Sequence, residues 1–176
     1  LVNELHIQAT TDQLTGIFNR RVVFEALDEA MDKANESQER QFTTIMFDID
    51  FFKQVNDTYG HAGGDAVLIE FAKLLQTEIT SPNIVGRIGG EEFLAILYLN
   101  EDQAAEFCKK LIIKINNNTV HFDGIDIKIT SSGGVAFSTE TETSADLTNK
   151  ADERLYEAKK SGRNRFKLID TELVGD

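Results

Sequence analysis

The chain has 176 residues, 41% of them hydrophobic and 27% charged, which is the ordinary balance of one globular domain with a real core. The formal net charge of −12 argues against a general nucleic-acid or anionic-membrane surface, because either would need a basic face. Cys108 is the only cysteine, which excludes an intrachain disulfide and a cysteine-based zinc cluster. No apolar run reaches membrane-spanning length and no signal-peptide pattern is present, although a chain that begins at Leu1 can be a piece of a longer protein.

The first half of the chain predicts helices on either side of one buried strand. Leu1, Leu5 and Ala9 have helical spacing, so residues 1–10 are expected to form the end of a linker helix. A turn-rich connector follows. The next expected elements are a helix that ends in a polar loop at 35–41, a strand at 42–47, a short helix at 51–57, and a separate, strongly amphipathic helix after residue 64.

The second half predicts two hairpins. Gly89 and Gly90 separate the apolar runs 84–85 and 93–97, and both glycines can adopt the positive φ of a two-residue turn. The expected elements that follow are a helix at 104–115 with Cys108 in its core face, a hairpin around Asp123-Gly124, an extension of that hairpin at 133–137 with a glycine bulge or close approach, a helix at 145–161 ended by Gly162, a strand at 165–169 and a loose tail.

This order of elements predicts the fold class. Strands alternate with helices, yet two short hairpins require antiparallel pairing, so we expect one mixed or antiparallel sheet with helices against it, an α+β fold (α/β sandwich). No internal repeat or second domain is present. The expected organisation is a linker-helix end at 1–11, one domain at 12–170 and a C-terminal tail at 171–176.

Several carboxylates lie where a metal ion would need them. Asp48 directly follows an apolar strand, where an ionised carboxylate is costly unless it is paired or bound to a metal ion. Mg²⁺ prefers oxygen ligands, so Asp48 with Glu91 or Glu92 would suit it if the fold brings them together. Of Asp48 and Asp50, only one is expected to be a ligand. The simpler alternatives are that Asp48 caps the following helix and that the two glutamates merely blunt a solvated hairpin.

Other polar residues suit a phosphorylated ligand. Lys53 lies in the first turn of a predicted helix, an unfavourable place for a cation unless it meets an anion. Lys159 and Arg163 flank the glycine that ends the last helix, where the alternative for Lys159 is pairing with the helix dipole. Asn56 and Asp65 would, in isolation, be a turn residue and a helix N-cap.

Taken together, these stretches resemble the GGDEF family of diguanylate cyclases. The resemblance runs from Asp12 to about Phe166, and although each motif is weak alone, all of them in this order are highly specific. The matching stretches are Asp12–Gly16, Asn19–Arg21, Phe47–Lys53, Asn56–His61, Gly64-Asp65, Arg87–Phe93, Gly134–Ala136, Ala151-Asp152, Leu155-Tyr156, Ala158-Lys159 and Gly162–Asn164.

The resemblance implies a palm-like, ferredoxin-like fold related to nucleotide cyclases and polymerases, with a central, largely antiparallel sheet flanked by helices. It implies a nucleotidyltransferase that needs Mg²⁺, with Mn²⁺ as a substitute, and that condenses two GTP into cyclic di-GMP and two pyrophosphates. In this family each domain binds one GTP, so a homodimer is needed for each 3′-hydroxyl to attack the other α-phosphorus. An upstream sensor domain, a cytoplasmic location, and no contact of this domain with nucleic acid or membrane are also expected.

Carried over position by position, the resemblance implies a metal site made by the Asp48 side chain, the Ile49 carbonyl and Glu91, which stands where the family name has Asp. Glu92 is the second acid, either an additional metal ligand or the base for the 3′-hydroxyl. Lys53 joins these two glutamates as a catalytic residue. The implied substrate contacts are Asn56 and Asp65 at the guanine edge, Lys53, Lys159 and Arg163 at the phosphates, and Gly89 and Gly90 where the backbone approaches the nucleotide.

One departure from the family pattern has a consequence. Many members carry Arg-x-x-Asp just before the signature as an inhibitory product-binding site, but Thr80 and Asn83 occupy those positions here, so we expect no inhibition through that site. Three alternatives to an active cyclase stay open. They are a catalytically silent domain that binds GTP and regulates a partner, a cyclase with relaxed base choice, against which Asp65 argues, and a plain α+β interaction module.

Overall fold

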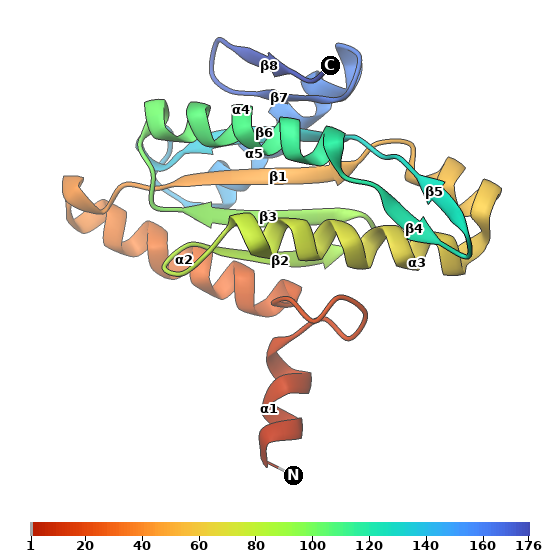
Figure 1. Cartoon of the computed structure of the whole chain (residues 1–176). Helices are drawn as coiled ribbons and strands as arrows, with labels where there is room; N and C mark the ends of the chain where they lie inside the picture. The colour runs from red at the N-terminus through yellow and green to blue at the C-terminus, as the bar shows by residue number, and fades with distance from the viewer. Residues whose placement is uncertain (1) are drawn as a thin grey trace.

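A computed structural model describes residues 2–176, which form one six-stranded sheet with helices on both faces and a separate two-stranded ribbon (Figure 1). The large sheet has the strand order β2-β3-β1-β6-β7-β8, and all its neighbours are antiparallel except β6 and β7. The predicted α+β fold with a largely antiparallel sheet is therefore confirmed.

The elements are α1 (Val2–Thr10), α2 (Arg20–Glu36), β1 (Thr43–Ile49), α3 (Phe52–Glu78), β2 (Ile84–Gly89), β3 (Glu92–Leu97), α4 (Glu101–Asn117), β4 (Val120–Phe122), β5 (Ile125–Ile127), β6 (Ser131–Phe137), α5 (Ser144–Lys160), β7 (Arg165–Lys167) and β8 (Glu172–Val174), with short 3-10 turns at Gln38–Arg40 and Ser138–Glu140.

The central strand β1 is buried along its whole length and divides the core in two. Its side chains alternate between the faces of the sheet, as strand geometry requires. Ile45 and Phe47 pack with Phe71 of α3 in one cluster, whereas Met46 packs with Leu27 of α2 in the other. In Figure 1, α3 and α4 lie in front of the sheet and α5 lies behind it. Asp48 is therefore on the same side of β1 as Met46, facing α5.

Strand β6 differs from the expectation. We expected residues 133–137 to extend the second strand of the Asp123-Gly124 hairpin, but that hairpin forms its own ribbon of β4 and β5, and β6 pairs with β1 in the large sheet. The expected close approach at its glycines is confirmed. A Cβ on Gly134 would lie 1.9 Å from the Ala151 carbonyl oxygen, so α5 rests directly on the backbone of β6.

Helix α3 confirms the expectation of two helices, because a kink at Gly60 separates them, although the second helix begins before residue 64 and not after it. It runs from Phe52 to Glu78 with a single non-helical residue, Gly60, at φ 76° and ψ 173°. The first and second helical segments pack tightly beyond this break, because a Cβ on Gly63 would lie 2.4 Å from the Tyr59 Cβ. Asp65 therefore lies inside the helix and is not an N-cap, which corrects that alternative.

The ends of the chain show one confirmation and one correction. The predicted N-terminal helix is present as α1, which has no buried residue and extends away from the body of the domain (Figure 1). The apolar position predicted at Leu1 lies outside the described residues. The expected loose tail instead contains β8, which pairs with β7. In the described part of the chain, no helix is both long and apolar enough to cross a membrane.

Candidate active site

Asp48 lies near the end of β1 with only 3% of its surface exposed. Its register partners are Glu92 on β3 and Ser132 on β6, so it lies in the middle of three strands. Its carboxylate forms an ion pair with Lys159 near the end of α5. The N-cap of α3 is Phe51, so the alternative in which Asp48 caps that helix is wrong.

The β2–β3 hairpin brings Glu91 beside the end of β1. The strands end at Gly89 and Glu92, so the two turn residues are Gly90 and Glu91, one position later than expected. Gly89 and Gly90 have φ values of 151° and 49°, and the register shifts just before them, which is the geometry of a glycine bulge. The Ile49 N–H donates to the Glu91 carbonyl at 3.3 Å, and this hydrogen bond connects the turn to the end of β1, which carries Asp48.

The carboxylates at this edge repel one another. The pKa of Asp48 is raised to about 6, mainly by burial; Lys159 lowers it, and the charges of Glu91 and Glu92 raise it. Burial also raises the pKa of Glu92, with the charge of Asp152 as the next cause. The ionised forms of Asp48 and Glu92 are therefore disfavoured in the protein alone. Such an arrangement is expected where a cationic ligand binds and stabilises the carboxylates.

Three cations surround the same edge. A pocket of about 300 Å³ is lined by Asp48, Ile49, Asp50, Phe51, Phe52, Lys53, Gln54, Glu91, Lys159 and Arg163. Lys53 comes from the first turn of α3, and Lys159 and Arg163 come from the end of α5 and the loop after it. Acidic residues from the end of β1 and the β2–β3 turn thus meet cations from α3, α5 and the loop after α5 in one pocket, although these segments are far apart in the sequence.

Asn56 and Asp65 do not line this pocket and lie further along α3. Asn56 follows Lys53 by one helical turn and therefore lies on the same face of α3. A Cβ on Gly64 would lie 1.9 Å from the Asn56 Oδ1, so the Asn56 side chain packs against the backbone beside Asp65. The break at Gly60 thus brings Asn56 next to the segment that carries Asp65.

Asp50 has a structural role that the sequence did not reveal. Asp50 is 4% exposed, and its carboxylate accepts hydrogen bonds from the Thr130 Oγ1 at 2.6 Å, the Ser132 Oγ at 2.7 Å and the Asn164 N–H at 2.9 Å. These donors satisfy both carboxylate oxygens. Asp50 thereby fastens the end of β1 to the start of β6 and to the loop that carries Arg163.

Arg87 is a second residue whose role sequence reasoning missed. Its Nε donates to the Gly90 carbonyl at 2.9 Å, and its guanidinium pairs with Asp12 at 3.2 Å. Asp12 also accepts from the Thr15 N–H at 2.9 Å. The Arg87 side chain therefore joins the connector after α1 to the β2–β3 turn that carries Glu91. Both residues lie in matching motifs, which was the signal available in the sequence.

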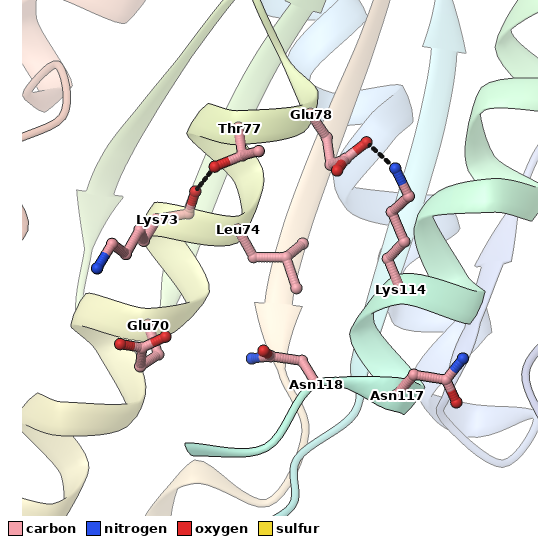
Figure 2. A pocket seen from close by; sticks show the side chains of 8 residues that line it. All are labelled: Glu70, Lys73, Leu74, Thr77, Glu78, Lys114, Asn117 and Asn118. Carbon is pink, nitrogen blue, oxygen red and sulfur yellow. Dashed lines mark hydrogen bonds and ion pairs between the residues drawn. The ribbon is translucent and has the colours of Figure 1, made fainter. Parts of the chain in front are cut away.

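A different hollow lies between α3 and α4 (Figure 2). Its volume is about 440 Å³, and its lining residues are Glu70, Lys73, Leu74, Thr77, Glu78, Lys114, Asn117 and Asn118. Glu78 and Lys114 are paired across it at 2.7 Å. None of the predicted site residues lines it, and its two acidic and two basic lining residues balance in number, so the smaller pocket beside Asp48 is the better candidate.

The donor set beside Asp48 suits a divalent cation. Asp48 and Glu91 supply carboxylate oxygens next to the Ile49 backbone, and the mutual repulsion that raises the pKa of Asp48 would be relieved by added positive charge. Within residues 2–176, no three Asp, Glu, His or Cys side chains form a preformed metal cluster. A site that uses two carboxylates and a carbonyl has to take its remaining ligands from substrate phosphates and water.

The positions of the family's inhibitory motif form a plain turn. The Asn83 N–H donates to the Thr80 carbonyl at 3.0 Å, and the Asn83 Oδ1 accepts from the Tyr98 N–H at 2.8 Å. Asn83 therefore fastens the start of β2 to the end of β3. Neither residue carries a charge.

The mixed sheet thus has a buried carboxylate near the end of its central strand, beside a second acid and three cations. The family described as "Diguanylate cyclase, GGDEF domain" matches residues 9–165. The chain belongs to this family, whose enzymes are nucleotidyltransferases.

Comparisons with individual proteins agree. The chain is 36% identical over 171 residues to "Diguanylate cyclase DgcS" of Shewanella oneidensis, covering 97% of this chain and 56% of that protein. It is 37% identical over 175 residues to "Diguanylate cyclase A" of Treponema denticola, covering 97% of this chain and 47% of that protein. The chain thus spans about half the length of these relatives.

Solved structures show the same similarity. The coiled coil and GGDEF domain of DgcB from Caulobacter crescentus, in complex with cyclic di-GMP, matches with a TM-score of 0.89 at 28% identity, covering 96% of this chain and 90% of that one. Diguanylate cyclase SiaD of Pseudomonas aeruginosa, in complex with its activator SiaC, matches with a TM-score of 0.88 at 34% identity, covering 96% of this chain and 65% of that one.

Proposed function

We propose that this domain condenses two GTP into cyclic di-GMP with release of two pyrophosphates, in a site completed by a second copy of the domain. The observation that carries the proposal is the single pocket that unites Asp48 and Glu91 with Lys53, Lys159 and Arg163. One such pocket offers ligands for one triphosphate and its metal ion. A condensation of two GTP needs two pockets that face each other, so the active form is a homodimer.

Each residue has a task in this proposal. Asp48, the Ile49 carbonyl and Glu91 would hold Mg²⁺, or Mn²⁺ in its place, which when bound would neutralise phosphate charge and polarise the phosphoryl group. Lys53, Lys159 and Arg163 bind the phosphates by charge-assisted hydrogen bonds. Because phosphoryl transfer depends mostly on positioning and charge stabilisation, these contacts supply most of the acceleration. Gly89 and Gly90 carry no side chains, so the backbone at these two positions can approach the nucleotide.

The guanine edge is read further along α3. Asp65 accepts from guanine N1–H and N2–H, and Asn56 completes the contact from the neighbouring helical turn. Asn56 lies one turn from Lys53, and its side chain packs against Gly64, the residue before Asp65. The same helix therefore spans the distance between phosphate and base.

The chemical step is the same in both halves. The 3′-hydroxyl of one GTP attacks the α-phosphorus of the other, a 3′,5′-phosphodiester bond forms, and the bond from the α-phosphorus to the bridging oxygen breaks as pyrophosphate leaves. Glu92 either accepts the hydroxyl proton or adds a ligand to the metal ion. Its raised pKa suits a group that takes up a proton.

The direct test is incubation of the domain with GTP and Mg²⁺, followed by mass analysis of the products at increasing protein concentration. We expect cyclic di-GMP and pyrophosphate, with a rate that rises faster than linearly with protein until the dimer saturates. An artificially dimerised protein that binds GTP but forms no cyclic di-GMP would favour a silent regulatory domain. Mixed dinucleotides from GTP and ATP together would show relaxed base choice.

The lack of charge at Thr80 and Asn83 leads to a second expected result. Cyclic di-GMP added to the assay should not inhibit through this turn, because neither residue can form the ionic contacts of an Arg-x-x-Asp site. We expect wild type and a Thr80→Ala variant to have the same inhibition curve. Strong inhibition by product that the Thr80 substitution removes would contradict this.

The wider protein also belongs to the proposal. The diguanylate cyclases of Shewanella oneidensis and Treponema denticola are about twice as long as the segment that matches, so we propose an upstream sensor domain that acts through α1. The Arg87 contacts with Asp12 and the Gly90 carbonyl provide a short physical connection from that helix to the turn.

A further inference from the structure

The segment that ends β1 and the loop that follows α5 lie side by side and are joined by a series of contacts. Asp48 pairs with Lys159, and Asp50 accepts from the Asn164 N–H at 2.9 Å. Next to these, the Arg163 guanidinium lies over the Phe51 ring, with its Cζ 4.6 Å from the ring centroid. This distance is that of a cation–π contact.

Phe51 is unusual in both backbone and side chain. Its backbone has φ 56° and ψ 34°, which is the left-handed region, and bulky residues rarely adopt this conformation. Its side chain is 53% exposed and belongs to neither cluster of the hydrophobic core. Phe51 therefore keeps an exposed ring on a left-handed backbone although neither core cluster includes it, and this ring lies against the Arg163 guanidinium.

Arg163 is held in a matching way. It also has a positive φ, 61°, as does Asn164 at 50°. The backbone N–H of Arg163 donates to the Ala158 carbonyl at 3.0 Å, and the backbone N–H of Asn164, the next residue, donates to the Asp50 carboxylate. Within residues 2–176, its guanidinium takes part in no ion pair. The ring thus supports a charge whose N–H groups stay available to an anion in the pocket.

We propose that Phe51 is a positioning residue for Arg163: its ring holds the Arg163 guanidinium toward the phosphates of the substrate, on a loop whose backbone the Asp50 carboxylate fixes at Asn164. This role rests on the proposed function, because it concerns how Arg163 is oriented for its proposed contact with the phosphates of GTP. A guanidinium held in place before binding loses less side-chain freedom when the phosphate arrives.

The test measures binding of a non-reactive GTP analogue, with a methylene group between the α- and β-phosphorus atoms, in the presence of Mg²⁺. Phe51→Leu should weaken binding about fivefold, and Phe51→Tyr, which keeps a ring, should bind like wild type. Arg163→Gln should weaken binding about 30-fold, and the Phe51→Leu/Arg163→Gln double variant should be no weaker than Arg163→Gln alone. Tyr156→Leu removes another exposed aromatic side chain, on α5, and is the matched control.

A second readout reports the contact itself. In the wild-type domain the ring current of Phe51 should shift the Arg163 Hε proton signal upfield, and this shift should disappear in Phe51→Leu but remain in Phe51→Tyr. Equal analogue binding by wild type and Phe51→Leu would overturn the positioning role, and so would additive losses in the double variant. A wild-type domain that binds no GTP analogue would instead overturn the proposed function, and this role with it.

Discussion

Glu91→Gln should lower the rate of cyclic di-GMP formation by about a thousandfold in a dimerised protein. The substitution keeps the size and one oxygen of the side chain but removes the charge that, with Asp48, would hold the metal ion. A loss of about 4 kcal/mol of transition-state stabilisation corresponds to this factor, and it is the scale expected when a bound metal ion no longer balances phosphoryl charge. The measurement is the initial rate of product formation at saturating GTP and Mg²⁺.

The stability of the same variant distinguishes a functional role from a structural one. Glu91 connects to the fold through its backbone carbonyl, which the substitution leaves in place. Its side-chain charge, by contrast, raises the pKa of Asp48 and so opposes the charged form of a buried group. We therefore expect the metal-free variant to melt at the same temperature as wild type or slightly higher.

Two controls complete this test. Glu153→Gln makes the same chemical change on the exposed face of α5, outside the pocket, and should keep the wild-type rate. Glu92→Ala compares the two acids of the signature, and a smaller loss than for Glu91 would favour an accessory role for Glu92. A Glu91→Gln variant with more than about a tenth of the wild-type rate would refute the assignment of Glu91 to the metal ion.

The position of the site was accessible from the sequence because its parts are local. Each part can be recognised within a few residues: a carboxylate at the end of an apolar strand, a glycine turn followed by acids, and basic residues in the first turn of one helix and the last turn of another. The family resemblance then placed them together, and the structure brings Asp48, Glu91, Lys53, Lys159 and Arg163 to one pocket.

The contacts that were missed depend on tertiary structure. The partners of Asp50 come from residues 130, 132 and 164, which no local pattern connects to it. The left-handed backbone of Phe51 is likewise imposed by the surrounding structure, since phenylalanine has no preference for it. The error at β6 has a similar cause, because a short β-rich stretch does not reveal which strand it will pair with.

The glycine at the centre of β6 leads to the second large effect. Gly134→Ala should destabilise the domain by about 3 kcal/mol, because its Cβ would lie 1.9 Å from the Ala151 carbonyl oxygen and 2.4 Å from the Leu155 N. Both are backbone atoms of α5, so no side chain can rotate away and the whole helix has to move. For a domain of this size, the melting temperature should fall by about 10 °C. Thermal denaturation followed by circular dichroism measures it.

Gly133→Ala is the matched comparison, one residue away on the same strand. Its Cβ would meet the Phe166 ring at 2.7 Å, and a side chain can shift where a helix backbone cannot, so we expect a loss of about 1 kcal/mol. Because α5 carries Lys159, the Gly134 variant should also lose activity at temperatures where it is still folded, as the helix moves Lys159 away from Asp48. A Gly134→Ala variant no less stable than Gly133→Ala would show that α5 can move outward without cost, and that its contact with the sheet does not fix the position of Lys159.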